Sequence, residues 1–393
     1  MLHSYAFSNF QSFRNRTEID LTLNLKTTMT DWMCETSTGE RVSKLMAVIG
    51  HNAGGKTALI KALVFLNWFV CHSFRALPKA NIPIAPHFNA ENESTEFEAI
   101  VDFDNKVWRY VLHCTQQRVI HEALYQKKDR FNYVFVRDWD QGSNSYHVKQ
   151  QEFGFPQQEV SKLRPNASLI STAAQYGVPL ATRLAGASIV TNVYALGKIP
   201  MGQDAVLTAA EHFSASPTQN LHMNRLLSAW DLGLVGVEFK EILSPTEDNP
   251  AKKVLVPFGR HMTKAAEKIL PFTLESNGTQ SAFVLLSRLL QALEIGGIAV
   301  IDEFENDLHP QMLEPILDLF ADPKTNPKNA QLLFTCHSVE ILNFLHKSQV
   351  MLVEKNADCE SSSCRLDAVE GVRNDDNYYA KYMSGAYGAV PNF

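Results

Sequence analysis

A run of eight residues near the N-terminus has the types and spacing that bind phosphate groups. The pattern G-x-x-x-x-G-K-[ST] is matched at every defined position by Gly50, His51, Asn52, Ala53, Gly54, Gly55, Lys56 and Thr57. The glycines allow backbone N–H groups to turn toward phosphate oxygens, the lysine ammonium reaches the β- and γ-phosphates, and the threonine hydroxyl can bind Mg²⁺. The sequence therefore predicts a site for a nucleoside triphosphate with Mg²⁺.

The residues on either side of this loop have the periodicity of the elements that must position it. An apolar run, Leu45–Ile49, precedes the loop and is typical of a buried strand. A helical pattern follows from Thr57, with Ala58 in its first turn, and the N-terminus of such a helix directs its positive dipole end toward a bound anion. We predict a strand–loop–helix unit in which the backbone from Gly50 to Ala58 holds the phosphates.

A second apolar strand, Ile298–Ile301, ends in two consecutive carboxylates. Asp302 is expected to lie beside the phosphate loop and to hold Mg²⁺ together with Thr57. Glu303 is then placed to polarise a water molecule for in-line attack on the γ-phosphate. Two acids after a core strand can also form a solvated strand end, but the phosphate loop upstream favours the catalytic interpretation.

A third apolar strand, Gln331–Thr335, leads to His337. A histidine at the end of a strand is often structural. Its place after the two carboxylates and a further predicted helix favours a residue that hydrogen-bonds the γ-phosphate and senses its loss. We therefore predict that His337 acts with Glu303 in catalysis.

The loop Leu274–Gln280 lies one predicted helix, about Gln280–Glu294, before the carboxylate strand. Ser276, Asn277 and Gly278 combine a hydroxyl, an amide and a glycine at a helix start, which is an anion-binding arrangement. The same residues also suit an ordinary turn and helix cap. Their order along the chain, between the phosphate loop and the carboxylates, favours a second phosphate-binding segment.

The composition is that of an ordinary globular protein. The chain has 393 residues, 45% hydrophobic and 20% charged, and its net charge of −6 excludes a basic nucleic-acid-binding protein as a whole. The start of the chain lacks the pattern of a signal peptide, and the most apolar window, Leu59–Phe74, carries Lys61 and Asn67 and falls short of a membrane span. The spacing of Cys359 and Cys364 is weak evidence for zinc. We expect a cytoplasmic protein with no membrane partner.

The element patterns divide the chain into three segments. Residues 1–155 alternate as strands, with a turn at Asp104–Asn105, and predict an antiparallel β lobe that includes the phosphate loop. Residues 156–244 have helical spacing without a heptad repeat and predict an inserted helical subdomain. Residues 245–393 alternate helix and strand, which predicts a parallel sheet. The predicted class is therefore α/β, with the three segments interleaved in one nucleotide-binding domain.

The motifs resemble those of the compact ABC-type ATPase heads grouped with the SMC, RecF and OLD ATPases. The resemblance spans nearly the whole chain and rests on the opening Phe7–Phe13, on Asn52, on Asp302–Pro310 (Walker B and D-loop) and on Thr335–Ser338 (the switch). It implies a P-loop NTPase fold of ABC-ATPase head type that binds and hydrolyses ATP. The chain differs from SMC proteins in having no long coiled coil, and from OLD proteins in having no C-terminal region for a Toprim nuclease.

Within this class the chain is similar to short defence-island AAA ATPases, typified by RloA, AbiL-type proteins and AriA of the PARIS antiphage system. The segments that carry this similarity are Pro83–Phe88 with Glu96–Glu98, His121–Tyr125, Trp230–Gly233 and Tyr382–Pro391. The similarity implies an ATPase that controls an effector on another polypeptide.

The ABC resemblance also implies roles for single residues. Ser276 and Gly278 would belong to the signature loop, which contacts the γ-phosphate of a partner's ATP, so that two heads sandwich two nucleotides. Asn306–Asp307 would be the D-loop at the seam between the heads. Two features depart from the ABC pattern: the signature has Ser-Asn-Gly rather than Ser-Gly-Gly, and Gln116–Gln117 is a poorly placed candidate for the Q-loop.

Three functions fit these features. The leading hypothesis is an ATP-dependent sensor and scaffold of an antiphage defence system, a homo-oligomer through the head-to-head ATP sandwich, which holds a nuclease-type effector encoded nearby until a phage protein triggers it. The alternative is a RecF-like DNA-repair ATPase that binds DNA ends or gaps, which the acidic net charge disfavours. A nucleotide-binding subunit of a transporter is a third hypothesis, disfavoured by the unusual insert.

Overall fold

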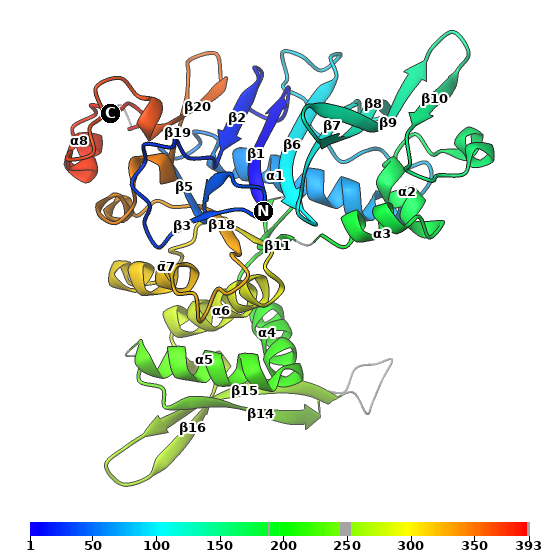
Figure 1. The fold of residues 1–393 in the computed structure, drawn as a ribbon. Coiled ribbons are helices and arrows are strands. Elements are labelled where there is room, and N and C mark those ends of the chain that lie inside the picture. Colours follow the sequence, from blue (N-terminus) through cyan, green and yellow to red (C-terminus); the bar gives the residue numbers. More distant parts are fainter. Residues whose placement is uncertain (188, 196, 231, 244–252, 391–393) are drawn as a thin grey trace.

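One helix, α1 (Lys56–His72), lies between two sheets of different kinds, as the computed structural model shows for residues 1–187, 189–195, 197–230, 232–243 and 253–390 (Figure 1). The first sheet is antiparallel and has the strand order β10-β9-β8-β7-β6-β1-β2. Its strands are β1 (Leu2–Ser8), β2 (Thr17–Asp20), β6 (Thr95–Phe103), β7 (Lys106–Cys114), β8 (Val119–Lys127), β9 (Phe131–Asp140) and β10 (Ser145–Gln150).

The predicted β meander is confirmed by this sheet. Asp104 and Asn105 connect β6 to β7, and both have positive φ angles, 53° and 56°. A two-residue hairpin turn of this kind matches the right-handed twist of the strands it joins, and Asp and Asn tolerate the left-handed conformation better than most residues. The N-terminal strand β1 pairs with β6, so the sheet joins segments that lie far apart in the sequence.

The second sheet carries the predicted phosphate-binding and carboxylate strands. Its order is β11-β17-β18-β5-β19-β20, parallel except for β20 at the edge. Its strands are β5 (Leu45–Ile49), β11 (Ile189–Thr191), β17 (Ile298–Ile301), β18 (Gln331–Thr335), β19 (Val350–Lys355) and β20 (Ser361–Arg365). The order places the carboxylate strand β17 two positions from β5, with β18 between them, so that the three predicted motifs share one sheet edge.

Side-chain alternation along β5 assigns each face of this sheet to a different core. Met46 and Val48 pack with α1 and the antiparallel sheet. Leu45, Ala47 and Ile49 pack on the opposite side, in a core that includes α6 (Asn277–Ile295) and α7 (Leu313–Ala321). All five residues are buried because both faces of the strand are covered, which explains the continuous apolar run in the sequence.

The apolar sequence of α1 reflects its central place. The segment Lys56–Arg75 is long and apolar enough to cross a membrane by length and composition, and 56% of its most apolar window is buried inside the protein. Short helices α2 (Leu169–Gln175) and α3 (Pro179–Ala185) pack against it. The helix is therefore packed as a core element between the two sheets.

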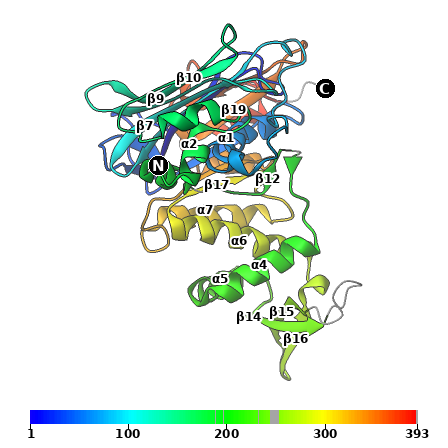
Figure 2. The ribbon, with the colours of Figure 1, turned by 90° about the vertical axis from the view of Figure 1, so that its right-hand side faces the viewer.

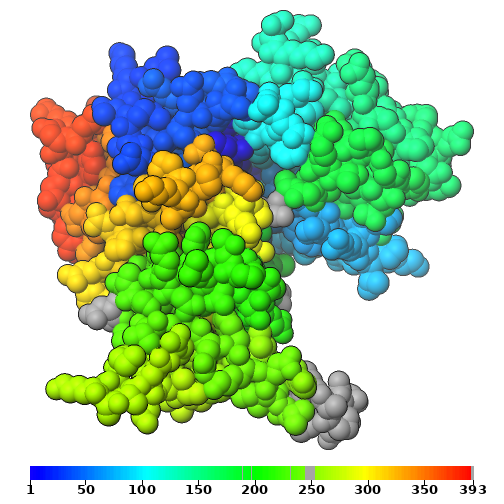
Figure 3. Space-filling view, turned by 60° about the horizontal axis from the view of Figure 1, so that its bottom comes forward, coloured from blue at the N-terminus to red at the C-terminus, as the bar shows by residue number. Residues whose placement is uncertain are grey.

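A smaller lobe projects below this body (Figures 2 and 3). It contains α4 (Gln203–Ala215), α5 (Pro217–Ala229) and a three-stranded antiparallel sheet of β14 (Gly236–Leu243), β15 (Lys253–Met262) and β16 (Glu267–Pro271). Both α4 and α5 contact α6 of the main body. We call this unit the lower lobe.

The prediction that residues 156–244 form one inserted helical subdomain is wrong, because the segment divides between several parts of the fold. Its last residue, Ser244, lies outside the described residues. The segment begins with the 3₁₀ helix η2 (Gln157–Lys162), α2 and α3 beside α1, then supplies β11 to the parallel sheet, and only then enters the lower lobe. The division arises because β11 pairs with β17, a long-range contact that local periodicity does not encode. Residues 1–155, predicted as one β lobe, likewise contribute strands to both sheets.

The last expected helix is replaced by short elements. After Thr335 the chain forms the 3₁₀ turns η5 (Val339–Asn343) and η6 (Lys347–Gln349), then β19 and β20, and ends with η7 (Leu366–Ala368) and α8 (Tyr378–Met383). The remaining short elements are β3 (Met33–Glu35), β4 (Arg41–Ser43), β12 (Val193–Tyr194), β13 (Gly197–Lys198), η1 (Ser73–Arg75), η3 (Phe272–Leu274) and η4 (Pro310–Met312). Across the ranges that the structure describes, no helix exceeds the 19 residues of α6. The predicted α/β P-loop fold with an antiparallel β lobe and no long coiled coil is confirmed.

Candidate nucleotide-binding site

The predicted motifs meet in one pocket at the carboxyl ends of β5, β17 and β18. The pocket has a volume of about 670 Å³. It is lined by Asn52, Ala53, Gly54, Gly55, Lys56, Thr57, Ala58, Asp302, Glu303 and His337. Ligands of open α/β sheets bind at this edge because the loops that follow parallel strands converge there.

The phosphate loop has the backbone conformation that its glycines permit. Gly55 has a φ angle of 119°, a value that L side chains rarely adopt, and Gly50 lies so close to β19 that a Cβ there would approach the Val353 carbonyl oxygen to 2.1 Å. The Lys56 ammonium donates to the Gly50 carbonyl oxygen at 2.9 Å and to the His51 carbonyl oxygen at 3.1 Å. The loop thus holds its lysine at the pocket.

Burial lowers the pKa of Lys56, although the nearby carboxylates of Asp302, Glu305 and Glu303 oppose the shift. The side chain is only 7% exposed, so its charge is poorly compensated by solvent. An anionic phosphate in the pocket would add further favourable charge around this ammonium group.

Several residues that the motif did not predict support the phosphate loop from behind. The Ser361 hydroxyl on β20 lies 2.7 Å from the Gly54 carbonyl oxygen, to which it can donate. The backbone N–H of His51 donates to the Ala389 carbonyl oxygen at 3.1 Å, and the Tyr382 hydroxyl donates to the same oxygen at 2.8 Å. The C-terminal segment is therefore packed against the phosphate loop.

Asp302 lies where the sequence predicts a metal ligand. Its carboxylate accepts hydrogen bonds from the Thr57 hydroxyl, at 2.9 and 3.1 Å, and from the Thr335 hydroxyl, at 2.6 Å. A hydroxyl and a carboxylate beside a phosphate-binding loop are hard oxygen donors that fit Mg²⁺, which keeps most of its other ligands as water or phosphate. Thr57 and Asp302 would hold that ion.

Glu303 adopts an uncommon backbone conformation, with a φ angle of 48°. Its N–H donates to the Thr335 hydroxyl at 2.7 Å, so one threonine fixes both consecutive acids. Its carboxylate accepts from the Lys198 ammonium at 2.6 Å, and this hydrogen bond is the main reason that the pKa of Glu303 is lowered. The side chain lines the pocket, as expected of a residue that contacts a water molecule there.

Asn192 is a further site-positioning residue that sequence reasoning missed. Its amide group donates to the Asp302 carbonyl oxygen at 2.9 Å and accepts from the Asp302 N–H at 2.7 Å. The pair of bonds fixes the backbone at the end of β17 from the neighbouring strand β11. The only local signal was a polar residue directly after a short apolar stretch, Ile189–Thr191, which occurs too often to be informative.

His337 also reaches the pocket, where its Nδ1 lies 3.5 Å from the Lys56 ammonium nitrogen. The backbone N–H of His337 donates to a carboxylate oxygen of Glu305 at 2.7 Å, and this hydrogen bond anchors the loop after β18. The imidazole and the lysine ammonium therefore face the same region of the pocket.

The predicted signature residues lie elsewhere. Ser276 caps α6 by accepting a hydrogen bond from the Thr279 N–H at 3.1 Å. Gly278 packs against the predicted D-loop so closely that a Cβ there would lie 2.8 Å from the Asp307 carbonyl oxygen. Of the described residues that line the pocket, none belongs to the signature; Ser276, Asn277 and Gly278 were predicted to bind the nucleotide of a partner chain, and this stays a prediction.

The family of the chain follows from a comparison with known proteins. Residues 45–343 match the family model described as "AAA domain, putative AbiEii toxin, Type IV TA system". The chain belongs to this AAA family. The matched range includes every residue of the pocket described above, and membership of an AAA family supports ATPase activity.

Solved structures with a similar chain path include two SMC heads. The SMC head domain from Thermotoga maritima is 14% identical, with a TM-score of 0.46 over 93% of this chain and 98% of that chain. The Smc head domain with a coiled coil and joint from Pyrococcus yayanosii is 9% identical, with a TM-score of 0.45 over 98% and 99%. No curated protein matches the chain.

The Q-loop candidate of this AAA-family chain is not at the site. Gln116 lies in the turn between β7 and β8, and its amide donates to the Ile84 carbonyl oxygen at 3.1 Å. The candidate Gln116–Gln117 is therefore corrected: it belongs to the antiparallel lobe, which packs on α1 away from the carboxylates. Asn192 is the amide side chain that the structure brings to Asp302 instead.

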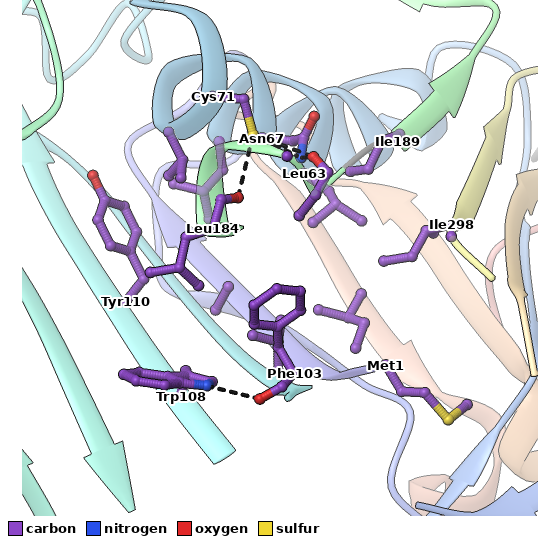
Figure 4. Close-up of a pocket in the computed structure, with 18 of the residues that line it drawn as sticks. Met1, Leu63, Asn67, Cys71, Phe103, Trp108, Tyr110, Leu184, Ile189 and Ile298 are labelled. Carbon is purple, nitrogen blue, oxygen red and sulfur yellow. Dashed lines mark hydrogen bonds between the residues drawn. The ribbon is translucent and has the colours of Figure 1, made fainter. Parts of the chain in front are cut away.

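A second cavity, of about 400 Å³, lies against the later turns of α1 (Figure 4). Leu63 of α1, Tyr110 of β7 and Ile298 of β17 line it, with Met1 at one end. The Trp108 indole N–H is already engaged by the Phe103 carbonyl oxygen at 2.9 Å. None of the described lining residues belongs to the phosphate loop, so this apolar cavity is separate from the nucleotide site.

Proposed function

We propose that the chain binds ATP with Mg²⁺ and hydrolyses it to ADP and phosphate. The observation that carries the proposal is the convergence of Lys56, Thr57, Asp302, Glu303 and His337 in one pocket, although three separate strands deliver them. Phosphoryl transfer depends mainly on positioning and on stabilising negative charge, and these groups supply both.

Each of these residues has a role in hydrolysis that follows from its functional group. The backbone N–H groups of the phosphate loop and the Lys56 ammonium bind the β- and γ-phosphates. Mg²⁺, held by Thr57 and Asp302, neutralises phosphate charge when bound. Glu303 accepts a proton from the water whose oxygen attacks the γ-phosphorus, while the bond to the bridging oxygen of ADP breaks. His337 contacts the γ-phosphate and responds to its loss.

We further propose that a complete site needs two chains. In one chain the signature residue Gly278 packs against Asp307 of the D-loop, and none of Ser276 to Gly278 is among the described residues that line the pocket. A second head placed face to face would bring its α6 N-terminus to the γ-phosphate, where a capped helix start favours an anion. The ATP-bound protein is then a homo-oligomer built on this ATP sandwich, as in the ABC-type heads that the motifs resemble.

The cellular role that we propose is that of an ATP-dependent sensor and scaffold in antiphage defence, acting in the cytoplasm. ATP clamped between heads stabilises one assembly state over another, which a switch requires. In that state the protein would hold a nuclease-type effector encoded nearby, until a phage protein changes the assembly. Support comes from the resemblance to defence-island ATPases and from a family description that names a toxin–antitoxin system.

Phage challenge of cells carrying the gene with its neighbours tests this role. Lys56→Ala is expected to abolish protection, while Lys381→Ala, which breaks only an exposed ion pair with Asp376, keeps it. Full protection with Lys56→Ala would refute the role. Tight, salt-dependent binding of the purified protein to gapped DNA would instead favour the RecF-like alternative.

A further inference from the structure

A small hairpin next to the parallel sheet contacts both acids of the nucleotide site. It consists of β12 and β13, which pair Val193 with Lys198 and Tyr194 with Gly197. At its base the Ile199 N–H donates to the Asn192 carbonyl oxygen at 2.7 Å, and Asn192 in turn binds the Asp302 backbone. Lys198, directly beside this base, binds the Glu303 carboxylate.

The contact with Lys198 occupies the group that hydrolysis requires. Glu303 Oε2 lies 2.6 Å from the Lys198 ammonium nitrogen, so this oxygen is engaged by a cation. Glu303 lines the pocket, whereas Lys198 is not among the described lining residues, so the ammonium approaches the carboxylate from outside the pocket. The hydrogen bonds of Asp302 and of the Glu303 N–H fix the backbone, which leaves the carboxylate as the group that can move.

The hairpin also connects the acids to the lower lobe. The chain leaves β13 at Lys198 and enters α4 at Gln203, and α4 packs on α6, whose first turn carries the signature residues. A displacement of the lower lobe, as expected when a second head docks on the signature, therefore reaches Lys198 through a short connection. Asn192 holds the base of the hairpin on Asp302 directly beside Lys198, so the long Lys198 side chain, rather than its backbone, is the part that can leave Glu303.

We propose that Lys198 is a positioning residue that restrains Glu303 in the single, nucleotide-free head and releases it when the ATP-bound assembly forms. The proposal rests on the proposed ATPase function and adds its regulation. An isolated head would then hydrolyse ATP slowly because its carboxylate is engaged by Lys198, and hydrolysis would be coupled to assembly.

Carbodiimide coupling tests the contact without reference to hydrolysis. This reagent joins a lysine and a carboxylate that are in direct contact, and the resulting amide between Lys198 and Glu303 can be identified by mass spectrometry. We expect the cross-link in nucleotide-free protein and at least a fivefold loss with Mg²⁺ and a non-hydrolysable ATP analogue. Lys162 and Glu159, 3.0 Å apart in η2, provide the internal control and should couple equally in both states.

Single-turnover hydrolysis at a protein concentration that keeps the heads separate tests the restraint. Lys198→Met is expected to raise the rate by about tenfold, a fraction of what a general base contributes, with an unchanged Kd for ATP. Lys198→Arg should keep the wild-type rate because it preserves the ion pair. Lys253→Met, which removes an equivalent exposed ion pair with Glu241 in the lower lobe, should have no effect.

The outcomes separate this inference from the ATPase proposal. A slower or unchanged rate in Lys198→Met, or a cross-link that the ATP analogue does not reduce, would overturn the restraint. If Glu303→Gln hydrolyses ATP at the wild-type rate, the proposed role of Glu303 in hydrolysis fails, and the cross-linking result then still shows whether nucleotide displaces Lys198.

Discussion

The phosphate loop was predicted to bind ATP within its own chain and the signature segment to contact the ATP of a partner, and the structure places these two segments in different surroundings. The phosphate loop faces a pocket that also contains Asp302, Glu303 and His337. The signature residue Ser276 satisfies its own helix, and Gly278 packs on the D-loop. In the arrangement that we propose, the phosphate-loop half of a site binds phosphate and activates water, and the signature half is supplied by a partner chain.

The largest effect is expected from Lys56→Ala, which removes the buried lysine ammonium group from the phosphate-loop half of the proposed site. ATP hydrolysis should fall by about 10²–10³-fold, the scale seen when one preorganised charge or donor is lost. Phosphate release and ATP titration would measure it, with Lys381→Ala as the control. Retention of normal ATP binding would contradict the assignment of the loop.

Glu303→Gln should separate ATP binding from ATP hydrolysis at the phosphate-loop half of the proposed site. The amide cannot accept the water proton, so hydrolysis should fall by about 10²–10⁴-fold while ATP binding persists. Mass photometry with ATP and Mg²⁺ should then detect a trapped dimer or larger assembly. An unchanged mass together with unchanged nucleotide occupancy would rule out the proposed role.

A matched pair at Ser276 tests the other half. Asp and Asn both replace Ser well as helix N-caps, so neither variant should change the melting temperature appreciably. Ser276→Asn should keep ATP-dependent assembly. Ser276→Asp places a negative charge where the partner's γ-phosphate would bind, and should weaken assembly by about 1–4 kcal/mol. Equal behaviour of the two variants would mean that the signature does not contact phosphate.

The smallest effect is expected from Tyr382→Phe, which removes one of the two donors to the Ala389 carbonyl oxygen behind the phosphate loop. The free energy of unfolding should fall by about 1 kcal/mol, and ATP affinity by less than about tenfold. Urea denaturation and ATP titration measure these quantities. Tyr379→Phe, at a nearby position of the same helix, is the control, and an equal change in both variants would argue against a specific contact.

Local patterns predicted the elements of the site that are local in the chain. The phosphate loop, the strand before Asp302 and the strand before His337 were predicted correctly because each motif and its flanking element are contiguous. Asn192, Lys198 and Ser361 were missed because each acts on a residue more than 100 positions away, through strands or hairpins too short to leave a periodic signal.

The same reasoning explains the errors in the fold. The segment 156–244 has helical spacing over most of its length, and most of its predicted helices are present. The segment is nevertheless divided between the helices beside α1, the parallel sheet and the lower lobe. This division depends on β11, a three-residue strand whose pairing with β17 is decided by tertiary packing. Likewise β19 is placed by its parallel pairing with β5, a strand from far earlier in the sequence, which local patterns do not encode.

Mixing two inactive variants tests most directly whether two chains share one site. Lys56→Ala and Ser276→Asp are each expected to hydrolyse ATP poorly alone. In a mixed dimer, one of the two sites combines Lys56 from the Ser276→Asp chain with Ser276 from the Lys56→Ala chain, so the account predicts that phosphate release recovers well above the mean of the separate variants. A mixture whose rate equals that mean would contradict the account, because the signature would then act within its own chain.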